Sequence, residues 1–254
     1  MATVARLNVT PLKSTSLHHP DSIELTESGV EGGHRFMLLE ADGRRVSGAA
    51  KAPLLGIVAD LDDNGTTLGL RFPGGNTIAA AAAPAGDPFE VELYRRHVRV
   101  REIPGPLPRA LSDHVGRPLR LVRVQEPEHA GGVHRASIIT LASVADLGRR
   151  AGTAESPDSR RFRMLIELDG REPYEEDSWS TRRVRIGAAV LKVAGSVPRC
   201  VLTNLDPDSG KSDFPALDVL AQYRRRGTEL LLGVYADVEA PGAIRIGDAV
   251  EILD

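Results

Sequence analysis

Cysteine is nearly absent from this sequence of 254 residues, which contains only Cys200. A single cysteine excludes an internal disulfide. It also excludes any zinc or iron–sulfur site that takes several cysteine ligands from the same chain. A redox enzyme built on this chain would therefore lack an iron–sulfur electron-transfer centre of its own.

Long apolar runs are missing as well. No stretch approaches the roughly 20 apolar residues that a membrane-spanning helix needs. The longest run of low polarity, residues 78–86, is rich in alanine and is broken by Pro84. Residues 1–11 lack the apolar segment of a secretory signal, and the net charge of −3 gives no general attraction to nucleic acid or anionic membranes. These features predict a soluble cytoplasmic protein with no membrane or nucleic-acid partner.

The one cysteine stands at a junction between predicted elements. The apolar run over residues 188–194 predicts a buried strand, and Asp-Pro-Asp-Ser-Gly at residues 206–210 predicts a turn. Arg199 precedes Cys200, and a neighbouring cation favours the thiolate that attacks substrates or binds metals. From composition alone, the favoured interpretation is a small buried core residue. A cysteine nucleophile with a histidine base is another, although none of the seven histidines has a spacing that identifies that base.

The order of predicted elements favours a mainly β fold with some α-helix. Short β-rich segments follow one another from residue 3 to residue 124 at intervals of roughly 8–12 residues, which is typical of a barrel or sandwich. Three helices are predicted, over residues 106–115, 141–150 and 215–222. Residues 125–132 contain one proline and two adjacent glycines, and they mark the best candidate boundary. We therefore predict one domain over residues 1–125 and another over residues 126–254.

Several short motifs, in order along nearly the whole chain, resemble those of the MOSC family, which is named after the C-terminal domain of molybdenum cofactor sulfurase. The resemblance is to the branch that contains the mitochondrial amidoxime-reducing component and its bacterial relatives. The motifs are Pro-Leu-Lys-Ser at residues 11–14, His-Arg-Phe at 34–36, Phe-Arg at 162–163, Glu-Asp-Ser-Trp at 176–179 and the segment 199–210 around the cysteine. Each motif alone is weak, and their order makes the resemblance specific.

The resemblance implies an N-terminal β-rich domain and a C-terminal MOSC β-barrel with a site at their junction. It implies that Cys200 is the protein ligand to molybdenum in a pterin-bound cofactor, Mo-molybdopterin. A thiolate is a suitably soft ligand. The residues that it implies for cofactor binding, besides the cysteine, are Lys13, Ser14, Arg35, His134, Arg135, Arg161, Arg163 and Arg199. Without the resemblance, Lys13 and Ser14 would be interpreted as a solvated surface pair.

The sequence departs from the family pattern at two places. His134 and Arg135 stand where the family has small hydroxyl residues near the cofactor. Met164 and Leu165 stand where the family has proline and asparagine after Phe-Arg. An asparagine contact is therefore missing, and we expect a neighbouring arginine, Arg160 or Arg161, to compensate for it.

The activity implied by the resemblance is the two-electron reduction of N-hydroxylated compounds to amines or amidines, independent of pyridoxal phosphate. Its electrons would come from a separate haem or iron–sulfur protein with its own reductase. An alternative is a sulfur carrier, a sulfur transferase or a C–S bond enzyme in which Cys200 acts as a persulfide or nucleophile. A third is a cofactor-binding or carrier protein without turnover. A resemblance of fold does not define the substrate.

Overall fold

The computed structural model describes residues 2–93, 96–125 and 130–253. Within these residues the strands form one eight-stranded sheet, one four-stranded sheet and two three-stranded sheets. The helices are α1 (Pro106–Val115), α2 (Leu141–Arg150) and α3 (Ala216–Tyr223), with 3-10 helices η1 (Gly48–Leu54), η2 (Ser159–Phe162), η3 (Glu175–Trp179) and η4 (Val201–Asn204). The described residues include no helix that is long and apolar enough to cross a membrane.

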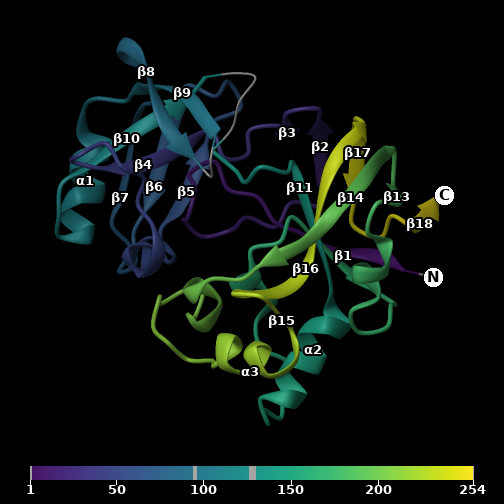
Figure 1. Ribbon diagram of the computed structural model, residues 1–254. Helices are drawn as coiled ribbons and strands as arrows, with labels where there is room; N and C mark the ends of the chain where they lie inside the picture. The colour runs from purple at the N-terminus through teal and green to yellow at the C-terminus, as the bar shows by residue number, and fades with distance from the viewer. Residues whose placement is uncertain (1, 94–95, 126–129, 254) are drawn as a thin grey trace.

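The eight-stranded sheet is a nearly closed barrel. Its order is β1–β12–β11–β16–β14–β13–β18, and β15 pairs with β16. The strands are β1 (Thr3–Leu7), β11 (Ala136–Thr140), β12 (Ile166–Asp169), β13 (Arg183–Ile186), β14 (Ala189–Pro198), β15 (Arg225–Arg226), β16 (Glu229–Ala240) and β18 (Val250–Leu253). The Val250 N–H donates to the Ala2 carbonyl over 3.0 Å, beside the two edge strands. The two ends of the chain therefore lie next to each other (Figure 1).

The beginning of the chain belongs to the barrel region rather than to the other β-sheets. β1 pairs antiparallel with β12, and β2 (Ser22–Thr26) pairs with β17 (Gly242–Arg245) and with β3 (Gly29–Val30). Figure 1 shows β1 and β2, in purple, beside green and yellow strands from the C-terminal half. The division at residue 125 stays a prediction, because residues 126–129 of the expected boundary lie outside the described residues.

A second group of sheets lies beside the barrel (Figure 1). One sheet has the order β4–β10–β9–β8 and the other β5–β6–β7. The strands are β4 (Phe36–Glu40), β5 (Val58–Leu61), β6 (Thr67–Arg71), β7 (Thr77–Ala81), β8 (Ala85–Leu93), β9 (Arg96–Glu102) and β10 (Leu119–Val124). Phe36, Leu54 and Leu121 are fully buried in a core shared by β4, β5, β6, β10, α1 and η1.

Local sequence explains why the elements begin and end where they do. In β13 the side chains of Val184 and Ile186 are buried, whereas the arginines that alternate with them are exposed, as expected for a strand with one face on a core. α1 ends at Gly116, whose φ of 76° suits glycine. α2 begins at Thr140, whose hydroxyl accepts the Ser143 N–H. The predictions of a mainly β fold and of all three helices, including the one that the structure shows as α3, are confirmed.

Candidate functional site

Cys200 lies where the long strand β14 ends. The Arg199 N–H pairs with the Leu230 carbonyl over 2.7 Å, which continues the strand pairing up to the cysteine. Cys200 then caps η4, and its carbonyl accepts the N–H and the hydroxyl of Thr203 over 3.0 and 2.8 Å. The Cys200 side chain is exposed, so its interpretation as a buried core residue is wrong. A rigid backbone thus presents the thiol to a cavity.

This cavity has a volume of about 510 Å³, within the usual range of small-molecule sites. Residues from both halves of the chain line it. The predicted site residues among them are Lys13, Ser14, His134, Arg135, Arg161, Arg163, Arg199 and Cys200. The structure therefore brings together segments that are far apart in the sequence.

Arg35 is the predicted site residue that the structure places elsewhere. It lines a neighbouring cavity of about 580 Å³, together with the carboxylates Asp60, Asp62 and Asp63. The two cavities share wall residues, including Thr10. The lining of the second cavity is rich in acidic groups, in contrast to the cationic lining of the cavity at Cys200.

Lys13 is buried in an environment of positive charge. Burial lowers the pKa of Lys13 well below its usual value, and the nearby cations Lys51 and Arg163 lower it further. Burial also lowers the pKa of Lys51, whereas the Cys200 side chain opposes that shift. An anion in the cavity would offset this clustering of positive charge.

Lys51 is a cavity residue that sequence reasoning missed. It lies in η1, it is 8% exposed, and it lines the cavity with Cys200. Ala52 of the same helix contacts Leu202 and Leu205, and this packing brings η1 beside η4. The sequence did contain a signal for this burial: Lys51 is the one charged residue in the run Gly-Ala-Ala-Lys-Ala-Pro-Leu. A segment that is otherwise apolar tends to be buried, and a lysine within it is then buried too.

The backbone is strained at the cavity. Ser14, His34 and Arg163 have φ values of 77°, 49° and 52°, in the left-handed region that glycine favours, and all three line the cavity. Such conformations cost on the order of 1–3 kcal/mol each and persist where the surrounding structure enforces them. They are three of the five non-glycine residues with positive φ in the described part of the chain. Strain is therefore concentrated around this site.

Arg199 contributes a buried guanidinium with an unused donor. Its Nη atoms donate to the Phe162 carbonyl and contact the Met164 sulfur at 3.2 Å. Its Nε is buried without a hydrogen-bond partner among the described residues. Burial lowers the pKa of Arg199, and Cys200 and Tyr235 oppose that shift. A buried donor without a partner is costly.

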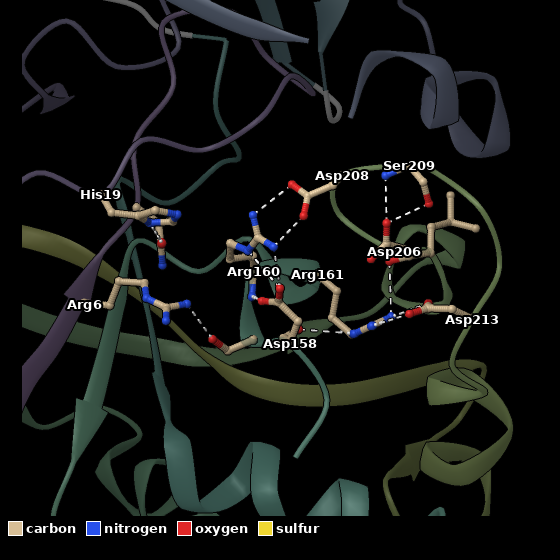
Figure 2. Close-up of polar contacts among 12 residues, drawn as sticks. Arg6, His19, Asp158, Arg160, Arg161, Asp206, Asp208, Ser209 and Asp213 are labelled. Atoms are coloured by element: carbon tan, nitrogen blue, oxygen red, sulfur yellow. Dashed lines mark hydrogen bonds and ion pairs between the residues drawn. The ribbon is translucent and has the colours of Figure 1, made fainter. Parts of the chain in front are cut away.

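Arg160 and Arg161 hold the loop that follows η4 in the sequence, through Asp208 and Asp213 (Figure 2). Arg161 forms a bidentate pair with Asp213, at 3.0 and 2.9 Å, and its guanidinium also donates to the carbonyls of Leu205 and Asp158. Arg160 forms a bidentate pair with Asp208 at 2.9 and 2.7 Å. Both guanidinium groups are thus committed to protein acceptors. The structure gives no support to the expectation that they replace the missing asparagine contact.

His134 and Tyr235 lie together on the cavity wall. Their rings stack with a centroid distance of 5.1 Å and an angle of 30° between planes. His134 Nδ1 lies 3.0 Å from the Asp237 carboxylate. Burial raises the pKa of Tyr235, whereas Arg199 opposes that shift. Arg135 lines the same cavity.

Residues 126–251 match the family model of the MOSC domain. The chain carries a MOSC domain. The predicted family resemblance is therefore confirmed, and Cys200 lies within the matched residues.

Known proteins with similar sequences share a modest sequence identity with this chain. It is 26% identical to mitochondrial amidoxime-reducing component 1 of Homo sapiens over 100% of this chain and 83% of the relative. It is 28% identical to mitochondrial amidoxime reducing component 2 of Homo sapiens over 98% of this chain and 83% of the relative. Molybdenum cofactor sulfurase of Oryza sativa subsp. japonica is 26% identical over 90% of this chain, which spans 32% of that protein.

A solved structure shares the fold of this MOSC chain. The YUAD protein from Bacillus subtilis superposes with a TM-score of 0.51, and the match covers 99% of this chain and 96% of that one. At 15% identity, the likeness concerns the fold alone. The expected mainly β architecture is confirmed by this match and by the barrel sheet.

Proposed function

We propose that this MOSC protein binds Mo-molybdopterin in the cavity at Cys200 and reduces N-hydroxylated compounds. The observation that carries the proposal is the exposed thiol of Cys200 in a cavity that buried cations line. A thiolate is a soft metal ligand, and buried cations favour a phosphate. The names of the amidoxime-reducing relatives support the choice of reaction.

The residues of the cavity fit this cofactor by their chemistry. Cys200 would supply the thiolate ligand, and Lys13, Ser14 and Arg163 would bind the phosphate and the polar edge of the pterin. We add Lys51 to this set, because it lines the same cavity. Three arginines are not included among the proposed cofactor-binding residues. Arg35 lines the other cavity, and the guanidinium groups of Arg160 and Arg161 are bound to Asp208 and Asp213.

The proposed reaction is balanced as R–NH–OH with two electrons and two protons giving R–NH₂ and water. When bound, the cofactor would supply the two-electron redox chemistry, and the protein would supply binding, orientation and electrostatics. The electrons would come from a separate haem or iron–sulfur protein with its reductase. One cysteine per chain cannot hold an iron–sulfur cluster by itself.

A second function is sulfur transfer through a persulfide on Cys200. The exposure of the thiol favours it, because a carrier sulfur has to reach its acceptor. The similarity to a molybdenum cofactor sulfurase also favours it. This function needs no bound molybdenum, so metal content separates it from the reductase.

The deciding experiment is analysis of molybdenum and pterin in the wild type and in Cys200→Ser, both purified from a host that makes molybdopterin. We expect near-stoichiometric metal in the wild type and a large loss in the variant, with thermal unfolding as the control for folding. The wild type should then reduce a simple amidoxime with an artificial electron donor. A well-folded wild type without molybdenum or pterin would overturn the reductase proposal, and cyanide-labile sulfur on Cys200 would support the persulfide. Metal without turnover would indicate a carrier.

A further inference from the structure

A histidine–carboxylate pair lies at the wall of the cavity. His134 comes from the segment before β11 and Asp237 from β16, and His134 Nδ1 lies 3.0 Å from the carboxylate Oδ2. The ring of Tyr235 stacks on the imidazole at 5.1 Å. The contact with Asp237 therefore holds the Nδ1 side of the imidazole, and the stacking on Tyr235 holds the plane of the ring.

This arrangement makes the opposite ring nitrogen available. When Asp237 accepts the hydrogen of Nδ1, the neutral imidazole has no hydrogen on Nε2, which then gains and releases the second proton. The side chains of His134 and Asp237 are 28% and 52% exposed, so solvent can replace a proton that the imidazole gives away. His134 also lines the cavity that contains Cys200. The pair thus connects the cavity with bulk water.

The proposed reaction needs such a group, because each turnover consumes two protons and hydroxide is a poor leaving group. The imidazole of His34 and the ammonium of Lys13 also line the cavity, and we select His134 because its ring nitrogen contacts a carboxylate. Arginine side chains stay protonated, burial raises the pKa of Tyr235, and Cys200 is assigned to the metal. An imidazole is the side chain whose ordinary protonation change falls between pH 5 and 8.

We propose that His134, oriented by Asp237, is the proton donor to the oxygen that leaves the substrate. This inference rests on the proposed reductase function. As the N–O bond breaks, two electrons arrive from the external donor protein, and the leaving oxygen takes a proton from His134 Nε2 and departs as water. The nitrogen takes the second proton from solvent. Asp237 holds the orientation of the imidazole through its contact with Nδ1.

Charged groups around the pair will modulate its pH dependence. Arg135 is the next residue on the same segment, and Arg96 donates to the carbonyls of Gly131 and Gly132, at 3.3 and 3.4 Å. Other titratable or charged groups that line the cavity are Lys13, His34, Lys51, Arg161, Arg163, Arg199, Cys200 and Tyr235. Lys192 lies directly opposite Asp237 in the pairing of β14 with β16. Most of these groups are cations, and Asp237 is the carboxylate that contacts the imidazole.

The first test needs no cofactor. Nitrogen–proton NMR of the cofactor-free protein at alkaline pH reports which ring nitrogen of each neutral histidine carries the hydrogen, and His134→Gln identifies the signal. We expect hydrogen on Nδ1 of His134 in the wild type, and a shift toward Nε2 in Asp237→Ala. Hydrogen on Nε2 in the wild type would overturn the proposed orientation.

The second test uses the molybdenum-loaded protein. We expect His134→Gln to keep the metal content and the KM of the wild type but to lower kcat by roughly 100-fold, a typical contribution of general acid catalysis. Added imidazole should restore part of the kcat of His134→Ala. The matched control is His18→Gln, because His18 lies 3.5 Å from Asp60 at the other cavity.

The outcomes separate the two proposals. An unchanged kcat in His134→Gln with an active wild type would overturn the proton-donor role and leave the reductase function intact. A parallel loss of metal and activity would also overturn it, and would instead make His134 a cofactor contact. A wild type without bound molybdenum would overturn both.

Discussion

Two sets of basic side chains meet near η2, and their surroundings differ. On one side Arg160 and Arg161 face the carboxylates of Asp208 and Asp213 (Figure 2). On the cavity side Lys13 has its pKa lowered by burial and by further cations. Paired cations stabilise a loop, whereas clustered buried cations oppose folding and are typical of sites that bind anions. Basic side chains thus hold a loop in one place and line the cavity at Cys200 in the other.

The largest effect that tests this comparison is expected from Arg161→Met. Arg161 is 4% exposed, and the variant loses its pair with Asp213 together with its donations to the loop that follows η4. We expect the free energy of unfolding to fall by about 3 kcal/mol, as measured by urea denaturation. A stability equal to that of the wild type together with lost molybdenum would instead make Arg161 the cofactor contact that the family resemblance implies.

The second prediction concerns Lys13→Met, which removes a buried charge from the cavity. We expect the cofactor-free variant to melt at a higher temperature than the wild type, because the buried charge is gone. We also expect about tenfold or more weaker cofactor retention, since a charge-assisted hydrogen bond contributes about 1.5–3 kcal/mol. The exposed Lys192 on β14 provides the control variant Lys192→Met. Loss of stability in Lys13→Met with full molybdenum content would contradict the comparison.

The third prediction is a pH dependence of the cofactor-free protein. The pKa of Lys13 is lower in the folded state than its usual value, so the unfolded chain binds more protons. The stability linked to Lys13 is present above the unfolded pKa of about 10.4, and it is lost as the pH falls through the lowered folded pKa. The wild type should therefore gain stability over Lys13→Met between pH 7 and 9, by at most about 1.4 kcal/mol per pH unit. If the free energies of unfolding of the wild type and of Lys13→Met, measured by urea denaturation, changed with pH in the same way, this assignment to Lys13 would be contradicted.

The smallest effect is expected for the exposed ion pair. The side chains of Arg160 and Asp208 are 27% and 63% exposed, so solvent screens their attraction. A double-mutant cycle with Arg160→Gln and Asp208→Asn should give a coupling free energy of about 0.5–1 kcal/mol. Molybdenum content should be unchanged in both variants. A loss of metal in Arg160→Gln alone would move Arg160 into the binding set.

Sequence patterns predicted the local structure well and the surroundings of the site poorly. The bounds of α1 and α2 follow from signals within a few residues, such as Gly116 after α1 and Thr140 before α2. Lys51 was missed because its burial results from the packing of η1 against η4. Arg35 was grouped with the other site residues, yet it lines a different cavity. The His-Arg-Phe motif identifies the position of Arg35 in the chain, but it does not indicate which of the two cavities its side chain lines.

By itself, the sequence determined the mainly β class, the helices and the choice of Cys200 as the one thiol. Each of these depends on composition or on neighbours along the chain. The tertiary structure alone decided that Cys200 is exposed to a cavity, that Lys13 and Lys51 share that cavity, and that Arg161 is held by Asp213. It also placed His134 beside Asp237, 103 residues away. The physical reason is that burial and charge pairing depend on contacts between distant segments, and these contacts form only when the barrel closes.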